Sequence, residues 1–100
     1  MLSQFLNEET TLTIIRFREG STYDGHRHGV AFTAYVDDEP RRCLVSDDAL
    51  DYHFSGDNAR TGDARRQLFE DNRALIQDAA RYLIEAGHTG DIVIRSSDFI

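Results

Sequence analysis

The sequence predicts a single α+β domain over residues 1–100, in which a small, mostly antiparallel sheet carries one long helix on one face. Two observations lead to this prediction. Period-two alternation of apolar and polar residues occurs in the first half of the chain and again near its end. Between them, from residue 63, apolar residues recur at three- and four-residue spacings, as on one face of a helix. The expected order is β-β-β-α-α-β, and residues 1–11 are expected to form a loosely ordered N-terminal arm.

Three strands are expected in the first half of the chain, over 12–18, 30–36 and 42–45, where residue types and alternation favour extended structure. The segment 19–29 separates the first two strands, and its three glycines predict a loop. Residues 37–40 are Asp-Asp-Glu-Pro, and such residues are common in turns, so we expect them to connect the second and third strands as a hairpin.

Helical structure is expected to begin at Ser46, because a serine followed by two aspartates suits the free N–H groups and the dipole of a helix N-terminus. A short helix is expected over 47–54 and a long one over 63–86, which Gly87 ends. Unbroken, the long helix would measure about 36 Å, more than a domain of about 13 Å radius of gyration covers. A bend, an overhang or a second subunit is therefore implied. The last strand is expected over 91–97.

The charge balance excludes several classes of partner. The chain carries 18 acids and 11 bases, for a formal net charge of −7, and every base is an arginine. So acidic a chain does not neutralise phosphate backbones and is repelled by anionic membranes, so we expect neither nucleic acid nor a membrane as partner. The stretch 37–63 holds eight acids and three arginines, whereas 64–100 is nearly balanced. A basic partner is expected at 37–63, and a second copy of the chain at the balanced helix.

Cytoplasmic localisation is expected. Residues 1–7 lack the charged and apolar regions of a signal peptide, and no apolar run approaches the roughly 20 residues of a membrane-spanning helix. Cys43 is the only cysteine, so no intramolecular disulfide can form. Its alternation with Val45 favours a core thiol, and a nucleophile close to the helix start at Ser46 is the alternative.

The chain contains a set of short motifs, which are, in order, Tyr23-Asp24, Val30-Ala31-Phe32, Val45-Ser46-Asp47-Asp48-Ala49-Leu50, Phe69, Asn72-Arg73, Ile76, Gly87, Gly90 and Ser97-Asp98-Phe99. This set resembles a small bacterial family, the domain of unknown function 1488. They span most of the chain, and their order and spacing carry the resemblance. The resemblance implies a small α+β fold and leaves the function open.

The loop after the first strand holds the first candidate binding residues. His26 and His28, two residues apart, could place two imidazoles on one side of an extended segment. A zinc or nickel site needs three or four supported ligands, so solvated loop histidines are favoured over a metal site. Together with Tyr23 and Asp24, the two histidines remain candidates for a small-ligand site.

Arg73 is the other candidate, because it lies within the helix at the matched segment Asn72-Arg73. The favoured interpretation is a structural salt bridge with Asp98 or Asp24, and the alternative is an anion-binding or interface arginine. The acids of 37–51 lack the spacing of a calcium loop, so turn and cap chemistry explains them.

These observations favour a non-enzymatic cytoplasmic accessory protein that acts through protein–protein contacts, as a homodimer or with an unidentified protein partner. No catalytic motif can be assigned, and no cofactor or metal is expected. The alternative is a small-ligand or metal-binding protein, or a minor enzyme, that uses the Tyr23–His28 loop. A third and less favoured hypothesis is that the acidic face mimics nucleic acid and blocks a basic partner.

Overall fold

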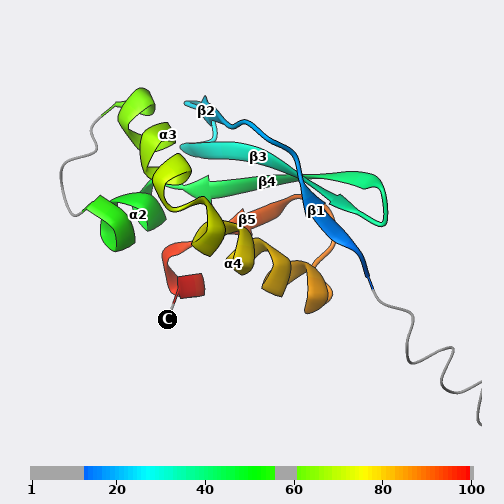
Figure 1. The fold of residues 1–100 in the computed structure, drawn as a ribbon. Helices are drawn as coiled ribbons and strands as arrows, with labels where there is room; N and C mark the ends of the chain where they lie inside the picture. Colours follow the sequence, from blue (N-terminus) through cyan, green and yellow to red (C-terminus); the bar gives the residue numbers. More distant parts are fainter. Residues whose placement is uncertain (1–12, 56–60, 100) are drawn as a thin grey trace, which may run out of the picture.

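The structure, a computed structural model, describes residues 13–55 and 61–99, and the predicted N-terminal arm lies outside this part (Figure 1). A five-stranded sheet has the order β1-β3-β4-β5, with β2 also paired to β3. The strands are β1 (Ile15–Phe17), β2 (Thr22–Asp24), β3 (Gly29–Val36), β4 (Glu39–Ser46) and β5 (Ile92–Ile94). The helices are α2 (Asp47–Leu50), α3 (Gly62–Asp71) and α4 (Arg73–Glu85), with a π-helical turn at Asp51–Ser55 and a 3-10 turn at Ser96–Phe99. The predicted α+β class is confirmed.

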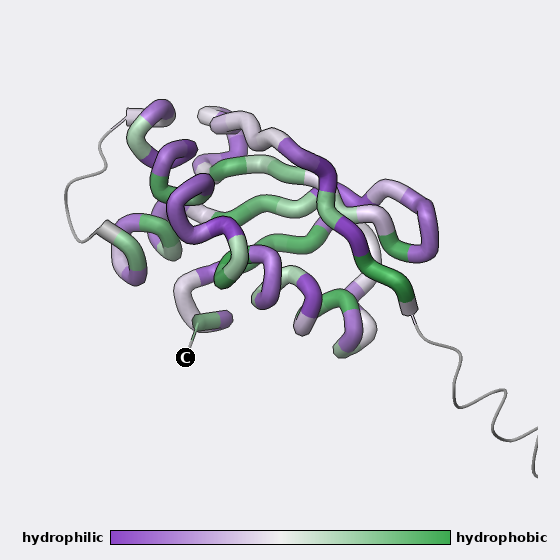
Figure 2. The backbone as a smooth tube through the Cα atoms, viewed as in Figure 1, coloured by the Kyte–Doolittle hydropathy of each residue, from purple (hydrophilic) through white to green (hydrophobic). Residues whose placement is uncertain are grey.

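The core lies between the sheet and the helices, which pack on the same face of the sheet (Figure 1). Figure 2 shows hydrophobic residues along β3 and β4, and along β5 at the edge of the sheet. The predicted alternation of β3 is confirmed, since Val30, Phe32 and Ala34 are buried and the residues between them are half-buried. β5 is parallel to β4, and the helices form the crossover connection that parallel strands require. Within the described residues, no helix is long and apolar enough to cross a membrane.

β1 and β2 form one interrupted edge strand, because both pair antiparallel with β3. The register places residues 19–21 opposite the single residue Phe32, which makes them a bulge. Gly20 has a φ of +98° there, a backbone conformation that favours glycine. The loop predicted over 19–29 is therefore wrong at Thr22–Asp24. Those three residues are extended because they pair with β3, a contact that local glycine content does not reveal.

The hairpin between β3 and β4 is tighter than predicted. Asp37 and Asp38 both have positive φ, +52° and +72°, as in the two-residue turns that match the twist of paired strands. The Asp37 carboxylate also accepts the backbone N–H of Ile14 at 3.0 Å. β4 therefore begins at Glu39, three residues before the strand predicted from sequence.

The single long helix predicted over 63–86 is a pair of helices, because the helical backbone is interrupted at Asn72, where φ is −122° and ψ is 25°. The Asn72 side chain donates to the Leu68 carbonyl at 2.9 Å, and this carbonyl also accepts the backbone N–H of Asn72 at 3.1 Å. The break lets α3 and α4 each follow the sheet. The length predicted for a single helix implied a bend, an overhang or a second subunit, and the structure shows a bend between α3 and α4 (Figure 1).

The predicted start of the short helix at Ser46 and the predicted end of the helical segment at Gly87 are both confirmed. The Ser46 side chain accepts the backbone N–H of Ala49 at 3.1 Å and caps α2. At the far end of α4, Gly87 has a φ of +100°. The N–H of Gly87 bonds to the Ile84 carbonyl and that of His88 to the Leu83 carbonyl, the double bond pattern of a glycine-terminated helix.

The Ser46 cap gives a first prediction. Replacing Ser46 by alanine leaves the Ala49 N–H without its acceptor, so the free energy of unfolding should fall by about 1 kcal/mol in urea denaturation. Ser97→Ala, at an exposed serine, is the matched control and should change it by less than about 0.5 kcal/mol. Equal losses in the two variants would show that the cap contributes nothing.

Candidate functional site

A groove lined by arginines runs between β1 and the two long helices. Its volume is about 750 Å³. The strand side consists of Ile15, Arg16, Phe17, Arg18, Glu19 and Gly20, and the helix side of Arg66, Glu70, Arg73, Gln77 and Arg81. The helix residues are three or four positions apart, so they form one stripe that continues across the break between α3 and α4. We call this feature the arginine groove.

The arginine groove differs in charge from the rest of the chain. It contains five of the 11 arginines but only two of the 18 acids, in a chain whose formal net charge is −7. The lining residues therefore carry an excess of positive charge, which favours anion binding, while Asp38 and Asp78 pair with Arg16 and Arg81 from beside the groove. The sequence alone points to Arg73 and not to the other four arginines. The helical spacing of Arg66, Arg73 and Arg81 is visible in the sequence, whereas their position beside β1 arises only from folding.

Arg73 lies at the centre of the helix stripe, and its guanidinium is held by a local carboxylate. Its Nη2 lies 2.8 and 2.7 Å from the two carboxylate oxygens of Glu70, and its Cζ lies 4.9 Å from the centre of the Phe69 ring. The predicted salt bridge with Asp98 or Asp24 is therefore wrong. Both of those carboxylates accept nearby backbone N–H groups instead.

Glu70 connects the helix stripe to the bulge of the edge strand. The Ser21 hydroxyl donates to Glu70 Oε2 at 2.6 Å, and Arg66 lies 3.7 Å from the same oxygen. Hydrogen bonds from Arg73, and then from Ser21, lower the pKa of the Glu70 carboxyl below its ordinary value. Glu70 therefore stays ionised in the folded protein, and it shows that a carboxylate can be held at this point by two arginines and a hydroxyl.

The remaining arginines lie along the rim of the groove. The Arg81 guanidinium lies 5.4 Å from the Phe17 ring and 2.7 Å from Asp78. Arg16 forms an ion pair with Asp38 in the turn between β3 and β4. Arg18 is exposed and forms no ion pair with another residue that the structure describes. Several guanidinium N–H groups thus face solvent at the groove.

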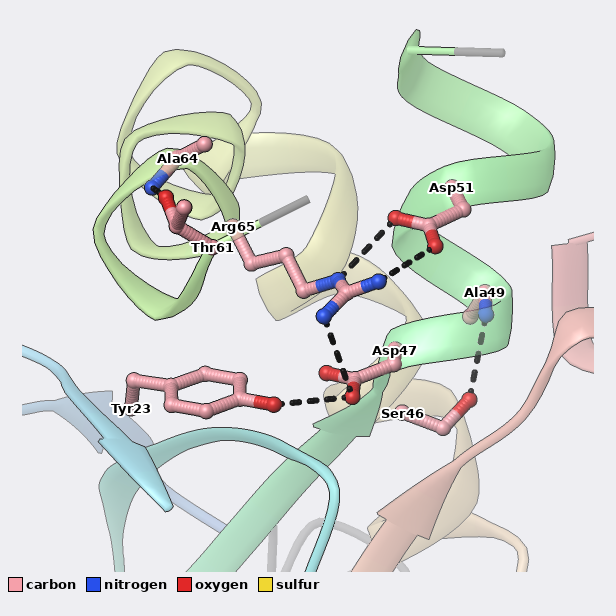
Figure 3. A network of polar contacts seen from close by, with 8 residues as sticks. All are labelled: Tyr23, Ser46, Asp47, Ala49, Asp51, Thr61, Ala64 and Arg65. Atoms are coloured by element: carbon pink, nitrogen blue, oxygen red, sulfur yellow. Dashed lines mark hydrogen bonds and ion pairs between the residues drawn. The ribbon is translucent and has the colours of Figure 1, made fainter. Parts of the chain in front are cut away.

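A second polar cluster joins β2 to the starts of α2 and α3 (Figure 3). The Tyr23 hydroxyl donates to Asp47 Oδ2 at 2.9 Å, and Arg65 lies 3.5 Å from the same oxygen. Arg65 also binds both carboxylate oxygens of Asp51, at 3.2 and 2.8 Å. Burial first, and then the Asp47 hydrogen bond, raise the pKa of Tyr23. A Cβ on Gly62 would lie 2.5 Å from the Tyr23 ring, so the ring also fixes the start of α3.

The structure does not bring the loop candidates together as a site. The Asp24 side chain accepts the backbone N–H groups of His26 and Arg27, both at 3.1 Å, and so shapes the turn. His26 and His28 are both exposed. Within the described part of the chain, no three His, Cys, Asp or Glu side chains are placed to hold one metal ion. Tyr23, the fourth candidate, is committed to Asp47.

The acids of 37–63 that the structure describes do not form one surface. Asp37 and Asp38 lie at the turn before β4, and Asp47 and Asp51 follow its other end, so a strand of eight residues, about 26 Å long, separates them. Arg65 pairs with both Asp47 and Asp51. The charge concentration seen in the sequence is therefore divided in space.

Cys43 is 1% exposed, which confirms the prediction of a core thiol. Burial raises the pKa of the thiol from 9.0 to about 11. The thiol therefore stays protonated at neutral pH and is not the thiolate that nucleophilic chemistry requires.

This pKa gives a second prediction. Below pH 9 the thiol is protonated in both states, but between pH 9 and about 11 only the unfolded chain loses the proton, so stability falls as pH rises. The slope from this group is about 1.4 kcal/mol per pH unit. Denaturant titrations across this range should show a steeper fall for the wild type than for Cys43→Val, which shares every other titrating group. Parallel curves would contradict it.

Comparisons with known proteins agree with the fold. The model of a family described as "Protein of unknown function (DUF1488)" matches residues 15–94. A crystal structure of a protein of unknown function from that family, from Shewanella loihica PV-4, is similar to this chain with a TM-score of 0.70 and 28% identity. The match covers 80% of this chain and 90% of the other. No curated protein matches the chain. Because the family match spans most of the sequence, as the resemblance predicted, the chain belongs to the DUF1488 family of proteins of unknown function.

Proposed function

We propose that this protein is a non-enzymatic cytoplasmic accessory protein that binds an acidic segment of a partner protein in the arginine groove. The observation that carries the proposal is the gathering of five arginines in one groove of a chain whose formal net charge is −7. Arginine side chains bind carboxylates through two parallel hydrogen bonds, which gives both attraction and orientation.

Two of these arginines are positioned before any ligand arrives. Arg73 lies over the Phe69 ring and Arg81 over the Phe17 ring, at 4.9 and 5.4 Å from the ring centres. A guanidinium held over an aromatic face has lost part of its side-chain freedom already, so binding costs less conformational entropy. The Glu70 carboxylate, which Arg73 and Ser21 bind, shows within this protein how the groove can hold a carboxylate.

A short acidic segment fits the surroundings of the groove better than a long polyanion does. Asp38 and Asp78 lie beside the groove as partners of Arg16 and Arg81. Charges on a protein surface act over a Debye length of about 8 Å at physiological ionic strength. A few carboxylates confined to the groove meet mainly arginines, whereas a nucleic acid that continued beyond it would meet carboxylates as well.

The proposal predicts that the protein binds a fluorescent oligoglutamate peptide in an anisotropy titration and does not bind the matched oligoglutamine peptide. Replacing Arg18 and Arg81 together by glutamine should weaken binding by about tenfold, because each lost exposed ion pair is worth up to about 1 kcal/mol and a tenfold change corresponds to about 1.4 kcal/mol. Arg95→Gln, outside the groove, is the control and should bind like the wild type.

Three outcomes would contradict this proposal. The first is no oligoglutamate binding in low salt. The second is an equal loss of binding in the Arg95→Gln control. The third is tighter binding of a single-stranded oligonucleotide than of the peptide, because the groove would then serve a nucleic acid.

Self-association through α4 is a second candidate function, favoured by an exposed apolar stripe on the helix. Leu75 and Tyr82 are 59% and 71% exposed. With Ala79 and Ala86 they occupy positions four, three and four residues apart, the spacing of a seam between two packed helices. The small alanines would allow a second copy of the helix to approach closely.

If the stripe joins two copies, light scattering after size exclusion should give about twice the chain mass of 11.4 kDa. Leu75→Asp, which puts a charge into the seam, should then give a monomer. Tyr52→Ser removes a side chain that is 77% exposed elsewhere and should leave the dimer intact. A wild-type protein that remains monomeric at every concentration would exclude this assembly.

A further inference from the structure

We infer that the acidic segment binds as an extended strand added to the free edge of β1, so that the arginine groove recognises a peptide backbone as well as carboxylates. This inference rests on the proposed function and specifies the conformation of the partner. Its additional evidence is the backbone of β1, which the proposed function does not use.

Alternate residues of β1 use their backbone groups to pair with β3. The Ile14 carbonyl accepts the N–H of Asp37 at 2.8 Å, and Arg18 donates its N–H to the Thr33 carbonyl at 3.0 Å. Arg16 lies two residues from both Ile14 and Arg18, so its backbone N–H and C=O groups also point towards β3. In an antiparallel pair the intervening residues turn their N–H and C=O groups away from the partner strand. Ile15 and Phe17 therefore present these groups outward.

β1 lies at the end of the strand order, and no strand among the described residues pairs with its outer side. An edge with free N–H and C=O groups is a template for an additional strand. The same residues, Ile15 and Phe17, also line the arginine groove. A segment lying in the groove thus has both charged side chains and a backbone edge within reach.

Side-chain alternation in such a strand matches the distribution of arginines. Side chains of a strand point to alternate faces, so every second residue would face the helices and the stripe of Arg66, Arg73 and Arg81. The residues between them would lie on the face to which Arg16 and Arg18 belong. Neighbouring arginines of the helix stripe are about 10–12 Å apart along the helices, close to the roughly 13 Å between strand residues i and i+4.

The bulge at 19–21 sets the length of this interaction. β1 loses its regular register there, at Gly20, so the edge offers only a few residues before it turns. So short an edge accepts one short segment and does not support continued strand addition. The site is therefore suited to a linear acidic motif of about four to six residues.

Amide hydrogen exchange measured by NMR, with and without an acidic peptide, tests this inference. Binding should slow exchange at the amides of Ile15 and Phe17 by at least about tenfold, since they would gain hydrogen-bond acceptors. The amide of Arg18, already bonded to Thr33, is the internal control and should change little. Peptides N-methylated at alternate positions give the complementary measurement. Methylation of the amides that face β1 should abolish binding, whereas methylation of the amides that face away from β1 should not.

The outcomes separate the two proposals. If the peptide binds in an arginine-dependent manner but exchange at Ile15 and Phe17 is unchanged, or both kinds of methylated peptide bind equally, strand addition is wrong and the proposed function stands. If the unmodified acidic peptide does not bind, the proposed function fails, and strand addition fails with it.

Discussion

Contact between three phenylalanine rings fixes the edge strand, the sheet and the helices relative to one another. Phe17 of β1 lies 6.2 Å from Phe32 of β3, and Phe32 lies 4.8 Å from Phe69 of α3, measured between ring centres. Offset and tilted rings at such distances attract one another beyond the effect of burial alone. Because the outer two rings also lie beneath Arg81 and Arg73, the same contacts place the guanidinium groups. The arginine groove is thus a product of core packing as much as of surface charge.

The elements predicted well from the sequence are those specified by neighbouring residues. The alternation of β3, the serine cap at Ser46 and the glycine end at Gly87 each depend on local chemistry, and all three were predicted. β2 was missed because three residues near glycines become a strand only when β3 lies beside them. The break at Asn72 was missed because apolar spacing continues across it, whereas the side-chain bond to Leu68 that accompanies it depends on one rotamer.

The candidate site was less predictable than the fold for a related reason. The sequence points to Arg73 but not to its partner, which is Glu70, one helical turn earlier, rather than a distant carboxylate. The histidine loop is a candidate ligand site by sequence because its residues are chemically versatile. In the structure, Asp24 shapes the turn and Tyr23 binds Asp47 instead. The groove itself joins residues about 50 positions apart in the chain, such as Arg18 and Arg66, and no local pattern records that proximity.

The separation of the arginine groove from the acids elsewhere on the chain has a kinetic consequence. A partner that carries an acidic segment meets the repulsion of a −7 chain at a distance, and attraction only within roughly 8 Å of the groove. Added salt screens the distant repulsion and also weakens the close contacts. Encounter rates would therefore stay level or rise slightly with ionic strength, while the lifetime of the complex would shorten, unlike the steered association of oppositely charged proteins. If an acidic segment binds in the arginine groove, this charge layout would place discrimination among partners at dissociation rather than at first encounter.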